Sequence, residues 1–388
     1  MDKRVYAKTT PFKGIQKNPT LLGFGCMRFP TLVPGKPEID EAKAEALIDA
    51  AYAAGITYFD TAWVYHGGTS ENFIGNVLKK FPRDSFFLAD KMPGWELKTQ
   101  ADAERIFAEQ LKKCQVEYFD FYLCHALDKA GYEAYRIPGV MPFLERMKAE
   151  GKIRHLGFSF HDSPEVLEAI LNDRQWDFVQ IQLNYLDWDF QKAKKQYALL
   201  EARGIPVVVM EPVRGGLLAT LSEDARKILL AAEPEKSVAS WAIRFAASRP
   251  GVMTVLSGMT EMSQVEDNLK TMTDFRPLSP AEEKTLFSAL SVFLKTVTIP
   301  CTACRYCMPC PHGVEIPTVF RAANEYRLNH WKGGFLENYE AIPEGGRAEA
   351  CVACGECMKH CPQKIAIPDR MKEIAALYRD IKAERAAK

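Results

Sequence analysis

Between about residues 21 and 275, short apolar runs alternate with longer stretches in which apolar residues recur three and four positions apart. Short runs rich in β-branched and aromatic residues indicate buried strands, and the longer spacing is typical of amphipathic helices. Two helices are clearly predicted, over 41–54 and 101–114. Eight strands are predicted, at 21–26, 57–60, 86–91, 119–124, 153–158, 178–182, 206–210 and 253–256.

The joints between these elements carry turn signals. Glycines at 55, 151 and 204 follow predicted helices, at the position where a helix commonly ends in a left-handed residue. Eight strand–helix units in roughly 290 residues match the count and size of a (β/α)₈ barrel. A doubly wound open sheet is the alternative, and it predicts a G-x-G-x-x-G turn after the first strand. Gly23 and Gly25 are present, but Arg28 stands where the third glycine belongs. The barrel is therefore favoured.

Amino-acid composition and net charge limit the classes of function that the chain can have. Apolar residues make up 47% and charged residues 26% of the 388 residues, the balance of a soluble globular protein. Fifty basic residues against fifty acidic ones give a net charge of zero, which argues against nucleic acid as a partner. No apolar run approaches the roughly 18 residues that a membrane span needs. The first residues have no apolar core typical of a signal peptide, so we expect a cytoplasmic protein without membrane partners.

Four reactive side chains stand at or just after successive predicted strands. The second strand runs into Asp60 and is followed by Tyr65, the third ends in Lys91, and the fourth is followed by His125. Catalysis in a barrel takes place where strands end and loops begin. Each residue has a structural alternative, as a helix cap, a half-buried ring, a surface lysine or a core histidine, but these alternatives would have to coincide at four successive positions.

This combination suits the interconversion of a carbonyl and an alcohol. Hydride addition to the carbon leaves charge on oxygen, and a proton must follow. A tyrosine is a weak acid, with an ordinary pKa of about 10, and a neighbouring ammonium lowers that pKa. We therefore predict Tyr65 as the proton donor, Lys91 as the group that lowers its pKa, Asp60 as the partner of Lys91, and His125 as the donor that orients the carbonyl.

Over roughly its first 275 residues, the chain resembles the aldo/keto reductase superfamily. The Asp-Tyr-Lys-His tetrad of that family falls on Asp60, Tyr65, Lys91 and His125. The matching stretches, in the family's order, are GITYFDTAWVYHGGTSE (55–71), FFLADKMP (86–93), DFYLCHALD (120–128), GKIRHLGFSFHD (151–162), VQIQLNYLD (179–187), MEPVRGGLL (210–218) and VLSGMTEMSQVEDNL (255–269).

The resemblance implies an NADP or NAD cofactor lying across the barrel mouth. Its expected contacts are Ser159, Gln182 and Asn184 at the carboxamide, Tyr185 stacked on the nicotinamide, Pro212, Val213, Arg214 and Gly216 along the pyrophosphate, and Ser257, Gly258, Met259, Gln264 and Asn268 at the adenosine. The segment 257–268 contains two glutamates and no basic residue. A 2′-phosphate has no cationic partner within that segment, so NADP is expected from the family while NAD stays open.

The last ninety residues have a different chemistry. Eight of the 11 cysteines lie between 301 and 361, in the patterns C-x₂-C-x₂-C-x₂-C-P and C-x₂-C-x₂-C-x₃-C-P. The second pattern is that of bacterial ferredoxins, whose fourth cysteine serves the other 4Fe–4S cluster. Two clusters are predicted, with zinc as the alternative. The crossed wiring gives one ligand set of Cys301, Cys304, Cys307 and Cys361, and another of Cys310, Cys351, Cys354 and Cys357.

We therefore predict an α/β protein with two domains: a barrel over 1–290 and a small, mainly helical ferredoxin-like domain over 291–388, with helices at 316–328 and after Pro368. A hydride carries two electrons and a cubane accepts one. A flavin would join the two chemistries, but no flavin motif is evident. Three functions stay open: a carbonyl oxidoreductase whose clusters exchange electrons with a ferredoxin- or flavodoxin-type partner, a carbonyl reductase with purely structural clusters, or an electron carrier whose barrel only binds nucleotide.

Overall fold

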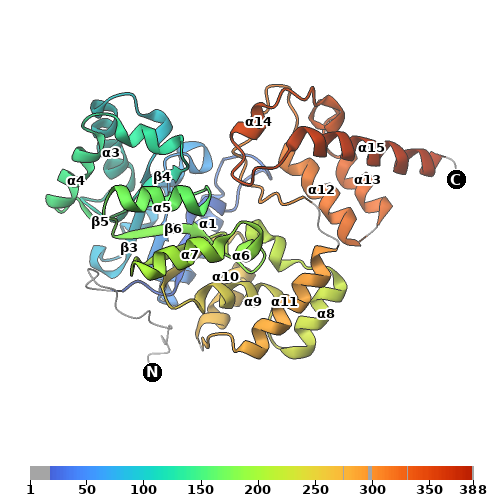
Figure 1. Ribbon diagram of the computed structural model, residues 1–388, viewed down its shortest axis with the longest axis horizontal. Helices are drawn as coiled ribbons and strands as arrows, with labels where there is room; N and C mark the ends of the chain where they lie inside the picture. Colours follow the sequence, from blue (N-terminus) through green and yellow to red (C-terminus); the bar gives the residue numbers. More distant parts are fainter. Residues whose placement is uncertain (1–17, 274, 296–298, 330, 387–388) are drawn as a thin grey trace. The chain divides into compact units, whose positions relative to one another are not determined.

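A computed structural model describes residues 18–273, 275–295, 299–329 and 331–386 (Figure 1). These residues form two compact units. The first takes in the chain up to Pro212 together with Ser240–Ser279, and the second takes in Val213–Ala239 and the chain from Pro280 onward.

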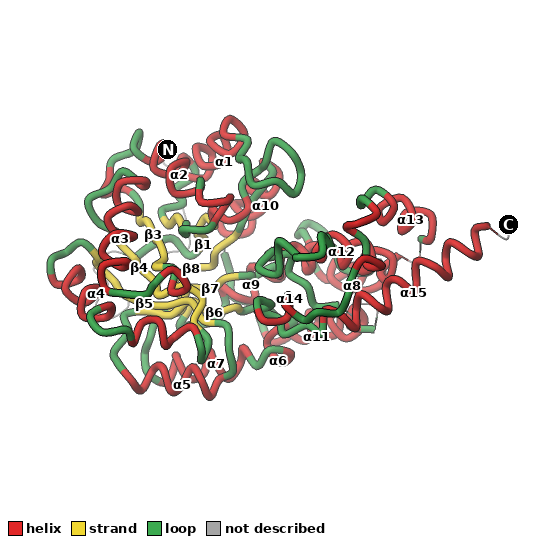
Figure 2. The backbone as a smooth tube through the Cα atoms, turned by 90° about the horizontal axis from the view of Figure 1, so that it is seen from above, coloured by secondary structure: helices red, strands yellow, loops and turns green. Residues whose placement is uncertain are grey.

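The first unit contains a closed barrel of eight parallel strands in sequence order, in which β8 pairs with β1 (Figure 2). The predicted barrel is confirmed, and each predicted strand is present. The strands are β1 (Leu22–Gly25), β2 (Tyr58–Asp60), β3 (Phe87–Met92), β4 (Phe119–Leu127), β5 (Ile153–Phe160), β6 (Phe178–Gln182), β7 (Val207–Met210) and β8 (Val252–Ser257).

Helices follow the strands, as a (β/α)₈ barrel requires. The α-helices are α1 (Glu41–Ala53), α2 (Ser70–Leu78), α3 (Gln100–Cys114), α4 (Val140–Ala149), α5 (Pro164–Asp173), α6 (Asp187–Phe190), α7 (Ala193–Ala202), α8 (Glu223–Ala232), α9 (Val238–Ala247), α10 (Met262–Thr273), α11 (Pro280–Leu294), α12 (Ile316–Asn329), α13 (Lys332–Glu340), α14 (Glu356–Lys359) and α15 (Ile367–Ala386). Short 3₁₀ helices are η1 (Cys26–Arg28), η2 (Tyr65–Gly68), η3 (Arg83–Ser85), η4 (Gly94–Glu96), η5 (Gly131–Arg136), η6 (Arg214–Ala219), η7 (Glu344–Gly346) and η8 (Ala348–Ala350).

Local sequence signals explain several boundaries. Thr99 and Asp102 form a reciprocal capping box that starts α3, and Ser163 caps α5 ahead of a proline in its first turn. The predicted helix-ending glycines all have positive φ: 96° at Gly55, 75° at Gly151 and 64° at Gly204. A residue with a side chain is strained in that conformation, so glycine determines where these helices end. Among the described residues, no helix combines the length and the apolar composition needed to span a bilayer.

Alternation along the strands determines which side chains fill the barrel. A buried apolar cluster contains Tyr58 of β2, Phe87 and Ala89 of β3, and Phe121 and Leu123 of β4. Because side chains alternate between the two faces of a strand, the next members of these three series lie on the same interior face. Those members are Asp60, Lys91 and His125, at the carboxyl ends of their strands.

Strand β4 is longer than predicted. The sequence pattern ends it at residue 124, whereas the structure continues it to Leu127, with a register shift against β5 after Cys124. Ala126 has a φ of 55°, and its backbone N–H donates to Ser159 Oγ at 2.7 Å. A local irregularity of this kind is what a bulge produces, and it lies directly after His125.

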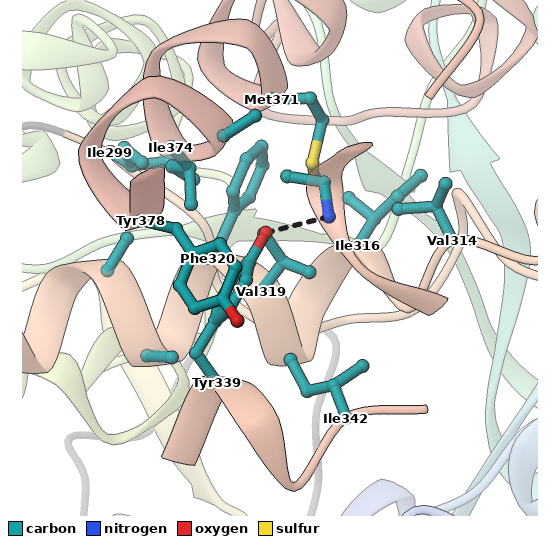
Figure 3. Close-up of a cluster of buried hydrophobic side chains, with 14 of the residues drawn as sticks. Ile299, Val314, Ile316, Val319, Phe320, Tyr339, Ile342, Met371, Ile374 and Tyr378 are labelled. Atoms are coloured by element: carbon teal, nitrogen blue, oxygen red, sulfur yellow. Dashed lines mark hydrogen bonds between the residues drawn. The ribbon is translucent and has the colours of Figure 1, made fainter. Parts of the chain in front are cut away.

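Helices α12, α13 and α15 of the second unit surround an apolar core (Figure 3). Ile316, Val319 and Phe320 of α12 pack in this core with Ile374 of α15, and helices α12, α13 and α15 all contact one another. The hydroxyl of Tyr339 accepts a hydrogen bond from the Ala348 N–H at 2.9 Å. The predicted helix over 316–328 is confirmed as α12, and α15 begins one residue before Pro368.

Candidate functional site

Lys91 is the centre of a polar cluster inside the barrel. Its Nζ donates to Asp60 Oδ1 at 2.6 Å, to the Thr61 carbonyl at 2.7 Å and to Tyr65 Oη at 3.2 Å. The side chains of Lys91 and Asp60 are 1% and 3% exposed. An ammonium has three protons to donate, and these three contacts use all of them. The structure therefore brings together three of the four residues predicted at the strand ends.

Burial dominates the electrostatics of Asp60. It raises the pKa of this carboxyl, while the attraction and hydrogen bond of Lys91 act in the opposite direction. In the described part of the chain, the second oxygen, Oδ2, is buried and has no hydrogen-bond partner. Lys91 is thus the partner that favours the charged form of Asp60 against the effect of burial.

From the sequence, Lys91 is predicted to lower the pKa of Tyr65. In the folded chain, however, the net shift of the Tyr65 pKa is upward. Burial raises the pKa of Tyr65 well above its ordinary value, and the negative charges of Asp60 and Glu211 add to the rise. The phenol is removed from water, and that penalty on the phenolate outweighs the nearby ammonium. Tyr65 is therefore protonated at neutral pH, with Lys91 donating to its oxygen.

His125 is the fourth member of the cluster. Its ring meets that of Tyr65 nearly edge-on, with centroids 6.2 Å apart, and lies 5.1 Å from the ring of Trp95. Its backbone N–H donates to Tyr135 Oη at 2.9 Å, and that hydroxyl donates to the Met92 carbonyl at 2.5 Å. Burial and the charge of Lys91 lower the pKa of His125 well below its usual value, so its imidazole is neutral at neutral pH. A neutral imidazole carries one N–H to donate.

His66, directly after Tyr65, anchors the segment that carries the phenol to the segment after β1. It has a φ of 52°, its Nε2 accepts from the Phe29 N–H at 3.2 Å, and its Nδ1 lies 3.1 Å from the Pro37 carbonyl. The first contact requires an unprotonated Nε2, so Nδ1 carries the proton and donates to Pro37. The neutral ring therefore ties η2 to two points of the segment after β1.

We expect this contact to make the protein less stable in acid. Burial lowers the pKa of His66 in the folded chain below its unfolded value of about 6.5. Below that pH, His66 is protonated in the unfolded chain but stays neutral in the folded chain. The stability therefore falls as the pH falls through the window between the unfolded and folded pKa values of His66. Urea midpoints at pH 7.5 and 5.5 should separate more for the wild type than for His66→Asn, and equal separations would contradict this assignment.

The structure also places two charged residues, Arg28 and Glu211, at the barrel mouth. Neither was predicted from the sequence. Arg28 Nη2 lies 3.4 Å from Glu211 Oε1, and Glu211 Oε2 is buried without a hydrogen-bond partner in the described part of the chain. The aliphatic part of Arg28 covers Gly258, where an added Cβ would lie 3.0 Å from the Cβ of Arg28. The predicted adenosine segment lacks a basic residue of its own, and the fold supplies one from the other end of the chain. No sequence signal joins residues so far apart.

The three residues predicted at the carboxamide lie at the ends of β5 and β6 or just after them, and each already has partners. Ser159 Oγ accepts from Ala126 and keeps its own proton to donate. Gln182 Nε2 donates to Asp187 Oδ2 at 2.7 Å. Asn184 Nδ2 donates to Asp187 Oδ2 and to the Glu211 carbonyl, and Oδ1 accepts from the backbone N–H groups of Leu186 and Asp187. These contacts use all four hydrogen-bonding positions of the Asn184 amide.

The remaining nucleotide residues are distributed over both units. Tyr185 is fully buried, and its ring packs edge-on against Phe245 with centroids 6.2 Å apart. Asn268 Nδ2 donates to Ser257 Oγ at 2.9 Å, and Gln264 Oε1 accepts from the Thr260 N–H at 2.7 Å. The first unit contains Pro212, Ser257, Gly258, Met259, Gln264 and Asn268, and the second contains Val213, Arg214 and Gly216. Their assignment to a nucleotide stays a prediction.

The eight clustered cysteines line two separate pockets in the second unit. The first cysteine set is Cys301, Cys304, Cys307 and Cys361, and the second cysteine set is Cys310, Cys351, Cys354 and Cys357. This is the grouping that crossed wiring predicts. Ile316 and Ile367 line both pockets, so apolar side chains lie between the two sets. Cys354 is exposed, whereas Cys357 is buried.

The thiols of each set influence one another across their pocket. Burial raises the pKa of Cys301 to about 12, Cys304 and Cys361 add to the rise, and Arg214 opposes it. Within the described residues, no group of three or more His, Cys, Asp or Glu converges as a single metal ion would require. Four thiols around one pocket are the donor set that a 4Fe–4S cluster requires.

Comparisons with known proteins match two successive parts of the chain. The model of the aldo/keto reductase family matches residues 21–290, and that of the 4Fe-4S dicluster domain matches residues 300–366. The second match covers all eight clustered cysteines.

Individual relatives match the barrel part. L-galactose dehydrogenase of Arabidopsis thaliana is 25% identical over 63% of this chain and 82% of its own length. The NADH-specific methylglyoxal reductase of Escherichia coli is 25% identical over 57% of this chain and 80% of its own. Among solved structures, the holo form of an aldo-keto reductase from Bacillus halodurans has a TM-score of 0.60 and 25% identity, and covers 73% of this chain and 96% of its own.

Proposed function

Because the chain belongs to the aldo/keto reductase family and carries a 4Fe-4S dicluster domain after its barrel, we propose that it interconverts a small-molecule carbonyl and its alcohol with NADP or NAD, and that two clusters exchange single electrons with a partner. The observation that carries the barrel part is the contact of one buried ammonium with Asp60 Oδ1 at 2.6 Å and with Tyr65 Oη at 3.2 Å.

The side chains of the barrel divide the work as follows. A nicotinamide, when bound, supplies the hydride. The Tyr65 hydroxyl then gives its proton to the oxygen on which charge develops, and Lys91 stabilises the phenolate that is left behind. Asp60 orients Lys91 through their 2.6 Å contact, in a site where both side chains are almost fully buried. His125, neutral because burial and Lys91 depress its pKa, donates a hydrogen bond that orients the carbonyl and does not itself provide the transferred proton.

The residues predicted to bind the nucleotide fit it only in part. Ser159 has a hydroxyl proton to donate, while the Asn184 amide would have to give up existing contacts to hold a carboxamide. Arg28 beside Gly258 provides a cation for a phosphate, which favours NADP. The family binds NAD(P)H, and one of the relatives above is NADH-specific by name, so both nucleotides belong in the first assay.

Each cysteine set has the donor chemistry of a 4Fe–4S cluster, four thiols around one pocket. Protein isolated without oxygen should therefore contain about eight iron atoms per chain. Cys307→Ser should lose iron from the first set and Cys357→Ser from the second, each removing about half of it. Cys114→Ser is the matched control, because Cys114 is buried in the barrel unit and should leave the iron content unchanged. If either cluster variant kept its full iron, the assignment of that set would be wrong.

The role of the clusters is tested separately, with the oxygen-free wild type and no carbonyl substrate. NADPH and then NADH are added while the cluster absorbance is followed, and bound flavin is assayed in parallel. Bleaching would support electron exchange, with a ferredoxin- or flavodoxin-type protein as the expected partner. If neither nucleotide bleaches the clusters and a chemical reductant does, the clusters receive electrons from another donor. A separate assay with carbonyl substrates and either nucleotide tests the barrel, and if it shows no turnover, the proposal reduces to an electron carrier.

A further inference from the structure

Arg214 has an environment that its position in the sequence does not suggest. It lies four residues after the end of β7, in the loop predicted to follow a pyrophosphate, yet it belongs to the second unit. Only 1% of its surface is exposed, and its φ is 49°. Its Nη2 donates to Gln363 Oε1 at 3.3 Å. Gln363 follows Cys361 by two residues and lines the pocket of the first cysteine set.

We propose that Arg214 is a positioning residue that raises the reduction potential of the cluster held by the first cysteine set, an inference that rests on the proposed presence of two clusters. Reduction adds one negative charge to a cubane, and a fixed cation nearby stabilises the reduced form more than the oxidised form. Net charge, hydrogen bonds and solvent exposure are the properties through which a protein adjusts cluster potentials. The buried guanidinium acts through the first of these and fixes Gln363 in place.

The burial of Arg214 is what makes its charge effective. Interactions between charges strengthen as water is excluded, because the surroundings screen them less. Another arginine, Arg305, lines the pocket of the first cysteine set itself and provides the contrast. Its side chain is 41% exposed, and its Nη2 pairs with Glu315 Oε2 at 3.4 Å. Water and a carboxylate both screen Arg305, so its contribution to the cluster should be small.

The effect should be confined to one cluster. Gln363 lines the pocket of the first cysteine set, and the residues that line the pocket of the second set do not include it. Ile316 and Ile367 lie between the pockets. Arg214 therefore distinguishes two clusters whose ligands are otherwise alike, and makes the first the easier one to reduce.

The test is a potentiometric titration of the full-length holoprotein, followed by electron paramagnetic resonance. Arg214→Gln is expected to lower the ratio of reduced to oxidised first cluster at least tenfold at a fixed potential, which corresponds to about 59 mV for one electron. The second cluster should keep its potential. Arg214→Lys should restore most of the wild-type value, and the matched control, Arg305→Gln, should shift neither cluster appreciably. Gln363→Glu, which places a carboxylate against the guanidinium, should lower the first cluster's potential if Arg214→Gln fails to fold.

Three results would overturn the inference. The first is an unchanged potential in both Arg214→Gln and Gln363→Glu, and the second is an equal shift of both clusters. The third is weaker binding of NADPH with no shift in potential, which would return Arg214 to the pyrophosphate. Iron analysis of the same samples separates these results from failure of the proposed function: a wild-type chain without eight irons refutes the clusters, whereas eight irons with unshifted potentials refute the role of Arg214 alone.

Discussion

Tyr65→Phe is expected to slow carbonyl reduction by at least about 100-fold, the lower end of the 10²–10⁴ range that general acid catalysis contributes. The phenol is the group that Lys91 reaches at 3.2 Å, and its raised pKa keeps it protonated at neutral pH. Phenylalanine retains the ring and its edge-on packing with His125, but it has no proton to give. The loss should therefore fall on kcat, with little change in the Kd of NADPH.

The matched control is Tyr52→Phe. Tyr52 lies on α1, and its hydroxyl contacts Ser85 Oγ at 2.8 Å, so the variant removes a phenolic hydrogen bond away from the strand ends. Its turnover should equal that of the wild type. The measurement is NADPH oxidation at saturating carbonyl, with single-turnover hydride transfer as a second readout. Full turnover by Tyr65→Phe would remove the proton-donor role and leave Lys91 or a water as the acid.

Lys91→Met should destabilise the barrel unit by about 3–4 kcal/mol at pH 7. It leaves the Asp60 carboxylate buried without its ammonium. Burial already raises the pKa of Asp60, and loss of Lys91 removes the interaction that opposes this rise. Asp60 would then take up a proton on folding. That uptake limits the loss at pH 7 to about 4 kcal/mol, because each unit between the ordinary pKa of about 3.9 and the ambient pH costs about 1.4 kcal/mol.

The sign of the pH dependence provides an internal check. The folded pKa of Asp60 in Lys91→Met lies above the unfolded one, so the variant keeps its stability below about pH 4 and loses it as pH rises toward neutrality. The double variant Asp60→Asn/Lys91→Met removes both charges and should recover most of the loss. Chemical denaturation of the single and double variants at pH 5 and pH 7.5 measures both effects. If the single variant is as stable as the double one at both pH values, the pair contributes nothing.

Much of the fold could be predicted from the chain because the signals that determine it are local. Alternating strands and amphipathic helices are patterns within a few residues, and the glycines that end helices are required by the backbone itself. The cysteine spacing is local too, since the first three ligands of a cubane lie within one short loop. Asp60, Lys91 and His125 share the interior face with Tyr58, Ala89 and Leu123 for the same reason, a period of two along each strand.

The strand bounds were less predictable where a tertiary contact changed them. β4 continues past residue 124 because Tyr135 and Ser159, from later parts of the chain, accept hydrogen bonds from the backbone of His125 and Ala126. The direction of the Tyr65 pKa was also beyond the sequence. A neighbouring ammonium can be read from the motif, but the degree to which the phenol is removed from water cannot.

What the sequence determined by itself is the set of reactive groups and their order: four side chains at the strand ends, and eight thiols in two runs, whose crossed partners stay a prediction. Only the tertiary structure decided which distant groups meet. It joined Arg28 to Glu211 across 183 residues and Arg214 to Gln363 across 149. It also engaged the side-chain amide of Asn184 in hydrogen bonds within the chain. The physical reason is that such pairs form only when the barrel closes or the helices pack, so neither spacing nor periodicity along the chain records them.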